Sequence, residues 1–276
     1  MPILVLDRQR PWRQRGPRTD QHVFLDVGGR AWSDSWAMAD YAANERRTQH
    51  KQLIVLDLNG TLLHRTARNK GRRKGYARPY LDEFLQFALD HFAVMVWSSA
   101  QPQSIREMLA KLMSPYSSRF VRVWDRRFCE LDRPYFEKAA CVKDLRRISD
   151  GFTLDESPYR DIYGPPEGYT GTCADAKGRW ALDNIIIVDD SATKIERNPA
   201  NHILVSTFAD PAARKSDGTP ADDDLLRLKQ YLEGYVERRD TLPSLLAYLE
   251  ETPWLQFRGS QPSTGQEQDH QSAIRA

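Results

Sequence analysis

Short apolar runs that alternate with amphipathic stretches restrict the fold of this chain more than any other feature. The runs that predict strands are 53–56, 93–97, 120–124, 185–188 and 202–205. Apolar residues at three- and four-residue spacing predict helices after Pro79, from Pro102 and from Asp222. Strands that alternate with helices build a mostly parallel sheet covered on both sides. The sequence therefore predicts an α/β fold.

The length of the chain and the spread of its apolar residues predict one main domain. The chain has 276 residues, of which 40% are hydrophobic, enough for one substantial core with long extensions. We expect a basic N-terminal arm over 1–50, a folded domain over 51–250 and a polar tail over 251–276. Residues 149–180 have no apolar period and predict an inserted loop, whose role as a lid stays open.

Composition limits the function classes. The net charge of +2 does not commit the whole chain to nucleic acid or membrane, and no apolar run approaches the roughly 18 residues of a membrane span. Cys129, Cys141 and Cys173 form no CxxC pair, so we expect neither a zinc site nor a disulfide framework. These features favour a location in the nucleus or cytoplasm, while five arginines within 1–18 leave a mitochondrial location open.

Polar residues follow three of the predicted strands at their carboxyl ends, where α/β sheets bind ligands. They are Asp57 and Asn59, then Ser98 and Ser99, then Asp189 and Asp190. Carboxylates from two strands at one edge suit Mg²⁺, and a carboxylate there can attack a phosphoryl group. One aspartate after a strand is more often a turn residue. The coincidence on three strands is what indicates a phosphate-handling site.

Five motifs, in order, resemble those of the FCP-homology phosphatases of the haloacid-dehalogenase superfamily, also called NLI-interacting-factor domains or small C-terminal-domain phosphatases. The motifs are Asp57-Leu58-Asn59-Gly60-Thr61-Leu62-Leu63-His64, Arg78-Pro79-Tyr80-Leu81-Asp82-Glu83-Phe84-Leu85, Val96-Trp97-Ser98-Ser99-Ala100, Val142-Lys143-Asp144-Leu145 and Val188-Asp189-Asp190-Ser191. The resemblance extends over residues 52–250. It implies a haloacid-dehalogenase-like Rossmannoid fold, a three-layer sandwich around a mostly parallel sheet.

The resemblance also implies a metal site. Asp57 would be the nucleophile and a Mg²⁺ ligand, and the backbone carbonyl of Asn59 and the carboxylate of Asp190 would be further ligands. Asp189 and Thr61 would order the loop behind these ligands. Mg²⁺ is therefore the expected cofactor.

A phosphate site is implied in the same way. Ser98, Ser99 and Lys143 would bind phosphoryl oxygens, and Ser98 and Lys143 would neutralise charge in the transition state. Without the resemblance, Lys143 beside Asp144 reads as an ordinary surface lysine.

Asn59 departs from the family pattern. The family has a second aspartate there, which serves as general acid and base, whereas an amide cannot exchange a proton at neutral pH. Losing this help typically costs about 10²–10⁴-fold in rate. The resemblance therefore implies retained Mg²⁺ and phosphate binding with slow turnover, or a long-lived aspartyl-phosphate. His64 is the nearest titratable residue in sequence that could replace the acid.

Residues 64–78 form a basic stretch without an acid. In the family this stretch lies near the substrate entrance, where we expect His64, Arg65, Arg72, Arg73 and Arg78. Its charge would attract a phosphopeptide or a nucleic-acid backbone. A solvated basic loop or a nuclear-import signal is an equal alternative.

Three functions compete at this point. The first is a slow Mg²⁺-dependent phosphatase, acting through an aspartyl-phosphate on phosphoserine or phosphothreonine proteins or other phosphoesters. The second is a catalytically impaired pseudophosphatase that serves as a protein-binding module, as in the receptor subunit of the mitochondrial inner-membrane translocase. The third is a basic nucleic-acid-associated protein, which rests on residues 64–78 and the arginine-rich arm.

Overall fold

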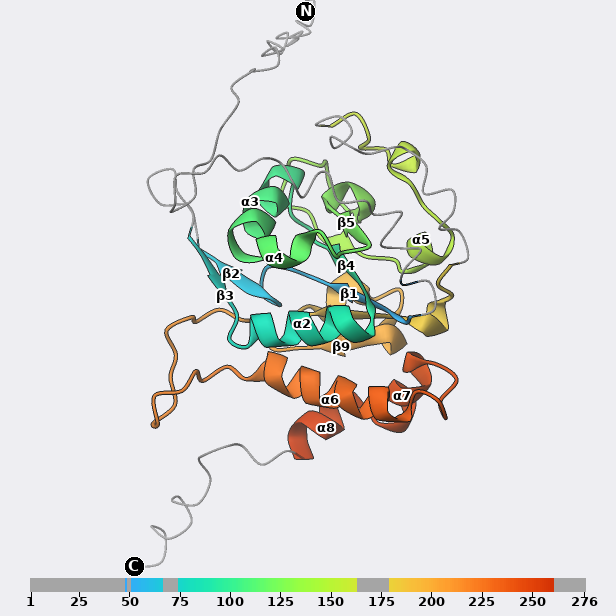
Figure 1. Cartoon of the computed structure of the whole chain (residues 1–276). Helices are drawn as coiled ribbons and strands as arrows, with labels where there is room; N and C mark the ends of the chain where they lie inside the picture. The colour runs from blue at the N-terminus through green and yellow to red at the C-terminus, as the bar shows by residue number, and fades with distance from the viewer. Residues whose placement is uncertain (1–47, 49–50, 67–73, 163–178, 261–276) are drawn as a thin grey trace, which may run out of the picture. The chain divides into compact units, whose positions relative to one another are not determined.

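A five-stranded parallel sheet forms the centre of the molecule, with strand order β5-β4-β1-β8-β9 (Figure 1). The computed structural model describes residues 48, 51–66, 74–162 and 179–260. The sheet strands are β1 (Leu53–Leu56), β4 (Ala93–Trp97), β5 (Arg122–Trp124), β8 (Ile185–Asp189) and β9 (His202–Leu204). All four pairings in this sheet are parallel. The predicted α/β fold is confirmed.

Two small antiparallel ribbons lie outside this sheet. The first pairs β2 (Leu63–Arg65) with β3 (Gly75–Ala77), and the second pairs β6 (Glu130–Leu131) with β7 (Cys141–Val142). Neither ribbon was predicted, because strands of two or three residues are too short to show a period of two.

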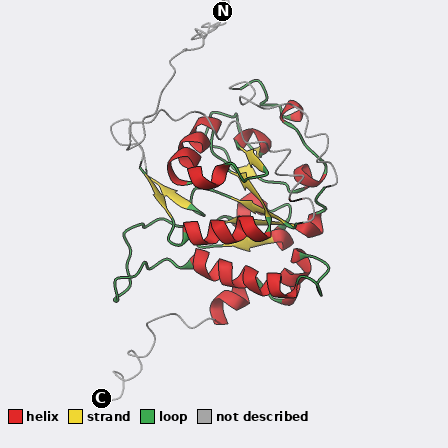
Figure 2. Ribbon diagram, in the orientation of Figure 1, coloured by secondary structure: helices red, strands yellow, loops and turns green. Residues whose placement is uncertain are grey.

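Helices and short helical turns connect the strands (Figure 2). The α-helices are α2 (Leu81–His91), α3 (Pro102–Leu112), α4 (Ser114–Ser117), α5 (Arg146–Ser149), α6 (Asp224–Arg238), α7 (Leu245–Glu251) and α8 (Trp254–Ser260). The 3₁₀ turns are η1 (Arg126–Phe128), η2 (Leu154–Glu156), η4 (Leu182–Asn184), η5 (Ala192–Ile195) and η6 (Pro199–Asn201).

Local sequence signals explain where the longer helices begin. Pro102 occupies the first turn of α3, where its missing N–H costs nothing. Asp82 and Glu83 lie in the first turn of α2 and favour the positive end of its dipole. The Ser244 side chain caps α7 by accepting a hydrogen bond from the Ala247 N–H.

The sheet buries both of its faces, so that alternate residues of one strand enter different cores. Ile54 and Leu56 of β1 pack into the core that α2, α3, α6 and α7 cover. Leu53 and Val55 pack into a second core that contains the aromatic rings of β4 and β5. Burial on both sides explains why β1 is a continuous apolar run.

The folded domain continues beyond the predicted boundary at residue 250, which corrects the assignment of 251–276 to a polar tail. Helix α8 packs against α6 and β9, and Trp254 is 4% exposed. The Trp254 indole N–H donates a hydrogen bond to the Leu204 carbonyl at 2.8 Å. The apolar residues Trp254, Leu255 and Phe257 lie within a single short helix next to a polar tail, too few to show a helical period, so the sequence pattern missed this helix.

The predicted insertion at 149–180 is attached to the second core at both ends. Leu154 and Trp180 are each 2% exposed there. The Trp180 indole N–H also donates to the Lys51 carbonyl at 3.0 Å. Residues 163–178, together with the N-terminal arm over 1–47, lie outside the described residues, so the lid question stays a prediction.

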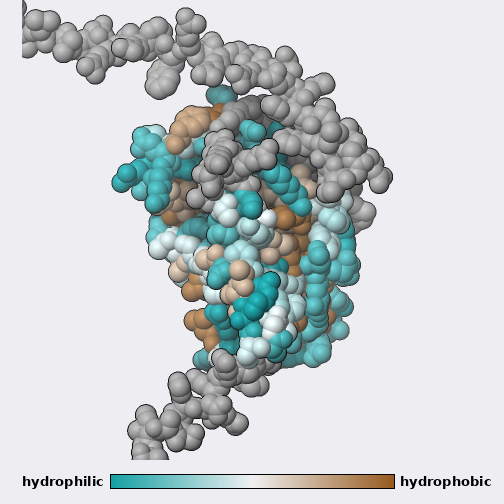
Figure 3. Space-filling view, turned by 90° about the vertical axis from the view of Figure 1, so that its left-hand side faces the viewer, coloured by the Kyte–Doolittle hydropathy of each residue, from teal (hydrophilic) through white to brown (hydrophobic). Residues whose placement is uncertain are grey.

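Within the described ranges, no helix is long and apolar enough to cross a bilayer. The face in Figure 3 is mostly hydrophilic and carries separate hydrophobic patches.

Candidate active site

The carboxyl ends of three neighbouring strands meet at one edge of the sheet. Leu56 at the end of β1 is in register with Val96 on β4 and Val188 on β8. The residues that follow are held there by the backbone: Asp57 N–H donates to the Val188 carbonyl, and Ser98 N–H donates to the Trp124 carbonyl, both at 3.0 Å. The convergence expected from the sequence is therefore observed.

Three carboxylates gather at this edge. Asp57, Asp189 and Asp190 each place one oxygen within 4.8 Å of the other two. Asp57 and Asp189 are buried, whereas Asp190 is half-buried. Clustered carboxylate oxygens are the donor set that suits a hard divalent cation such as Mg²⁺.

Lys143 lies under this carboxylate cluster with no solvent exposure of its side chain. Its ammonium group is 2.8 Å from Asp57 Oδ1 and 2.6 Å from Asp189 Oδ2. Burial alone would lower the pKa of Lys143, but the Asp189 and Asp57 charges raise the pKa above its ordinary value. Lys143 is therefore a buried residue held between two carboxylates, and the surface-lysine alternative does not hold.

Lys194 is a second cation at the cluster, and the sequence reasoning missed it. Its ammonium group is 3.3 Å from Asp57 Oδ2, 3.0 Å from Asp189 Oδ1 and 3.3 Å from Asp190 Oδ1. Burial would lower the pKa of Lys194, yet the three carboxylates, Asp57 foremost, raise it. The signal available in the sequence was its position four residues after Asp190, on the turn that follows β8.

The loop after Asp57 is shaped to receive Asp190. Gly60 has a φ of 96°, and a Cβ atom there would collide with the Asp190 carboxylate. Thr61 Oγ1 accepts a hydrogen bond from the Asp190 N–H at 3.1 Å. Thr207 Oγ1 donates to Asp190 Oδ2 at 2.9 Å from the other side. Gly60 and Thr61 therefore fix where the Asp190 carboxylate lies.

Asn59 is exposed two residues beyond Asp57. Its amide oxygen accepts a hydrogen bond from the Arg65 N–H at 2.9 Å. This contact ties the loop to β2. The amide supplies no exchangeable proton at this position at neutral pH.

The serines that follow β4 lie directly beyond the end of this strand. Ser98 is 2% exposed, and its hydroxyl oxygen accepts a hydrogen bond from the Ala100 N–H at 3.3 Å. Ser99 is half-buried beside it.

Arg78 does not line an open entrance, which corrects that expectation. Its side chain has no solvent exposure, and it pairs with Asp222 at 2.7 Å and Asp224 at 3.0 Å. The same guanidinium donates to the Thr61 carbonyl at 2.9 Å. Arg78 therefore joins the active-site loop to the start of α6, because two carboxylates compensate its charge away from water.

The other residues expected at the entrance divide into two groups. His64 lies on β2 with its ring 6.5 Å from Tyr76 and 6.4 Å from Phe208, centroid to centroid. The Arg65 guanidinium donates to Ser104 on α3 at 3.2 Å. Arg72 and Arg73 lie outside the described residues. The nucleic-acid hypothesis rests mainly on residues outside the described ranges and stays a prediction.

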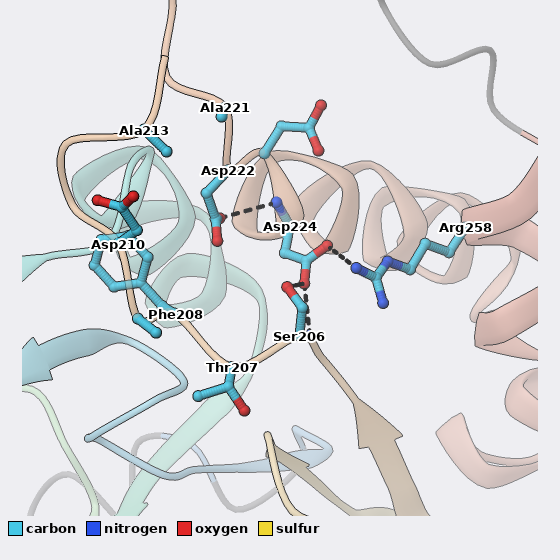
Figure 4. Close-up of a pocket in the computed structure, with 11 residues that line it drawn as sticks. Ser206, Thr207, Phe208, Asp210, Ala213, Ala221, Asp222, Asp224 and Arg258 are labelled. Atoms are coloured by element: carbon cyan, nitrogen blue, oxygen red, sulfur yellow. Dashed lines mark hydrogen bonds and ion pairs between the residues drawn. The ribbon is translucent and has the colours of Figure 1, made fainter. Parts of the chain in front are cut away.

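A pocket of about 360 Å³ adjoins the carboxylate cluster (Figure 4). Its lining comes from the segment after β9, the start of α6 and α8: Ser206, Thr207, Phe208, Ala209, Asp210, Ala213, Ala221, Asp222, Asp223, Asp224 and Arg258. Asp224 is paired with Arg258 at 2.8 Å and accepts from the Ser206 hydroxyl at 2.6 Å. Thr207 connects this pocket to Asp190.

Comparison with known proteins agrees with the motifs. Residues 52–242 match the model of the family described as NLI interacting factor-like phosphatase. An uncharacterized FCP1 homology domain-containing protein of Schizosaccharomyces pombe is 29% identical over 215 residues, which are 75% of this chain and 79% of that protein.

Two CTD phosphatases are also similar. The ubiquitin-like domain-containing CTD phosphatase of Arabidopsis thaliana is 27% identical, over 76% of this chain and 52% of that protein. Ubiquitin-like domain-containing CTD phosphatase 1 of Homo sapiens is 23% identical, over 70% of this chain and 52% of that protein. The chain thus spans about half the length of these two relatives.

Among solved structures, fission yeast RNA polymerase II CTD phosphatase Fcp1 bound to beryllium fluoride aligns with a TM-score of 0.44 and 14% identity. The alignment covers 74% of this chain and 69% of that chain.

Proposed function

We propose that this chain, which belongs to the family of NLI interacting factor-like phosphatases, is a slow Mg²⁺-dependent phosphatase that works through an aspartyl-phosphate on Asp57. The observation that supports this most is the setting of the Asp57 carboxylate. It lies at the end of β1, with each oxygen against a different ammonium group, from Lys143 and Lys194. Such a buried, charge-compensated carboxylate is held in position for attack on an incoming phosphoryl group.

The proposed Mg²⁺ ligands are the Asp57 and Asp190 carboxylates and the Asn59 backbone carbonyl. Bound Mg²⁺ would supply positive charge beside the phosphoryl group. Asp189 would hold Lys143 and Lys194 in place, because its two oxygens pair with one lysine each. The three carboxylates and two ammonium groups carry one net negative charge, so a divalent cation would turn the site positive and attractive to a phosphate dianion.

The proposed reaction has two displacements at phosphorus. An Asp57 carboxylate oxygen forms a bond to phosphorus while the bond to the leaving oxygen breaks. Water then attacks the aspartyl-phosphate and releases inorganic phosphate and the free carboxylate. Lys143, Ser98 and Ser99 would bind the phosphoryl oxygens during both steps.

Asn59 makes both steps slow in this proposal. No carboxylic acid stands there to protonate the leaving alkoxide or to take a proton from the attacking water, which costs about 10²–10⁴-fold in rate. An aryl phosphate loses less in the first step, because its leaving group needs no proton.

The proposed substrate is a phosphoserine or phosphothreonine protein, since the similar proteins of Arabidopsis thaliana and Homo sapiens are CTD phosphatases. Asn59 also supports a second function, that of a pseudophosphatase that binds a phosphorylated partner without useful turnover. The two functions share one site and differ only in rate.

Hydrolysis of an aryl phosphate in the presence of Mg²⁺ tests the proposal. The variants are wild type, Asn59→Asp and Asp57→Asn, with Asn184→Asp as a matched amide-to-acid control at the opposite end of β8. We expect slow turnover for wild type and turnover about 10²-fold or more faster for Asn59→Asp. Asp57→Asn should show no turnover.

The outcomes separate the two functions. If wild type hydrolysed no aryl phosphate while the Asn59→Asp variant did, the chain would be a pseudophosphatase. An Asp57→Asn variant as active as wild type would contradict the proposed nucleophile, as would a gain from Asn184→Asp equal to that from Asn59→Asp.

A further inference from the structure

The Lys194 ammonium group lies among the three carboxylates of the active site. It contacts an oxygen of each one, at 3.3 Å from Asp57, 3.0 Å from Asp189 and 3.3 Å from Asp190. Two of these, Asp57 and Asp190, are the proposed carboxylate ligands of Mg²⁺. The Lys194 ammonium group thus contacts the same two carboxylates that would bind the divalent cation.

The two lysines of the site differ in their freedom to move. Lys143 is wholly enclosed, with no exposure of its side chain, and its ion pairs are with Asp57 and Asp189. Lys194 keeps 20% of its side chain exposed. The Lys194 backbone is anchored, because its carbonyl accepts a hydrogen bond from the Lys143 N–H at 2.7 Å. The base of the Lys194 side chain is therefore fixed while its end can turn toward water.

A divalent cation and this ammonium group compete for the same oxygens. Mg²⁺ binds oxygen at about 2.0–2.1 Å and accepts little departure from octahedral geometry. An ammonium group that donates to the same carboxylates takes up their lone pairs, and the two positive charges repel each other at short range. The ammonium group and the divalent cation therefore weaken each other's hold on Asp57 Oδ2 and Asp190 Oδ1.

We propose that Lys194 is a displaceable counter-ion, which compensates the three carboxylates in the metal-free protein and gives up Asp57 and Asp190, but not Asp189, when a divalent cation binds. This inference rests on the proposed function, since it concerns the same Mg²⁺ site. Without Lys194 the metal-free cluster would keep three carboxylates against the one ammonium of Lys143. Like charges at this distance destabilise a folded protein.

Two opposite effects follow for a variant that lacks the ammonium group. The metal-free protein loses stability, because one compensating charge is gone. The affinity for a divalent cation rises, because the cation no longer displaces a bound competitor; coupling of this kind is worth about 5–150-fold. A lysine that lay away from the three carboxylates would change neither quantity in this way.

The test uses the full chain and needs no enzyme activity. Mn²⁺ is titrated and followed by electron paramagnetic resonance, and Mg²⁺ is titrated by calorimetry. The variants are Lys194→Met and Lys194→Gln. Lys229→Met is the matched control, because Lys229 is 21% exposed and pairs with two carboxylates, Glu83 and Glu233, on the helices. Thermal unfolding is recorded for each variant in chelator and in saturating Mg²⁺.

We expect both Lys194 variants to bind Mn²⁺ and Mg²⁺ about tenfold more tightly than wild type, and to unfold at a lower temperature in chelator. Their gain in unfolding temperature on adding Mg²⁺ should exceed that of wild type, and this readout survives even if a variant is barely folded without metal. Lys229→Met should bind both metals as wild type does.

Two results would overturn the inference, and they can be told apart. Unchanged or weaker metal binding in both Lys194 variants, with wild type binding normally, would exclude competition and leave the proposed metal site intact. Absence of Mn²⁺ and Mg²⁺ binding in wild type and in every variant would remove the metal site itself, and with it both proposals.

Discussion

Asp57 shares its two carboxylate oxygens between Lys143 and Lys194 at the centre of the site. The sequence identified Asp57 from its place after a buried strand, and it identified Lys143 only through the family motif. It did not identify Lys194, because the signal of a position four residues after Asp190 is weak and no apolar pattern in η5 shows that this turn folds back over the strand ends. Single residues at strand ends are predictable because the sheet fixes them, whereas residues on irregular turns are not.

Cys141 gives a prediction at the scale of one residue. A hydrogen bond from Cys129 lowers the pKa of Cys141 to about 7, while burial raises the pKa of Cys129. In a Cys173→Ser background we expect iodoacetamide to modify Cys141 with a rate that rises through pH 7, as the thiolate forms. Peptide mass spectrometry would follow both sites.

Cys129 is the internal control of this experiment, because it is 2% exposed. It should stay unmodified in the folded protein at every pH where Cys141 reacts. Equal modification of the two, or a Cys141 rate that rises only near pH 9, would contradict the assigned hydrogen bond.

At the scale of elements, the strands with continuous apolar runs were the most predictable. The run 93–97 matches β4 at both ends, whereas β5 begins at Arg122 rather than at residue 120. The segment that joins β9 to α6 could not be foreseen, since Arg78 holds it by ion pairs across 144 and 146 positions of the chain. Contacts so distant in sequence leave no local pattern.

Arg78→Met tests this connection. The substitution leaves Asp222 and Asp224 without their buried partner, so we expect a loss of about 3–5 kcal/mol in the free energy of unfolding. Urea unfolding measures this loss. Arg119→Met is the control, because the Arg119–Asp90 pair is exposed at 40% and 48%. If Arg78→Met cost no more than Arg119→Met, the structural role of Arg78 would be wrong.

At the scale of the whole molecule, one parallel sheet has a hydrophobic core on each face, and the folded domain extends to α8. The α/β class followed from the alternation of strands and helices, which is a property of the entire chain. The end of the domain did not follow, because α8 has only seven residues and contributes Trp254 and Phe257 to the core next to a polar tail. A boundary set by composition misses so short an element.

Trp254→Ala tests whether α8 belongs to the fold. Trp254 is 4% exposed and its indole is hydrogen-bonded to β9, so we expect a loss of about 3–5 kcal/mol in the free energy of unfolding. Its neighbour Leu255 is 63% exposed, and Leu255→Ala should change stability by no more than about 0.5 kcal/mol. Equal effects in denaturant unfolding would place the end of the domain before α8.

The central claim is that Asp57 takes up the phosphoryl group and that Asn59 slows its release. Rapid mixing of wild type with p-nitrophenyl phosphate and Mg²⁺ measures this directly. We predict a burst of about one p-nitrophenolate per chain followed by slow turnover. The aryl group leaves without a proton, whereas the attack of water on the aspartyl-phosphate is slow. Asn59→Asp should convert the burst into steady turnover. A burst that persists in Asp57→Asn, or the absence of any p-nitrophenolate from both wild type and Asn59→Asp, would contradict the claim.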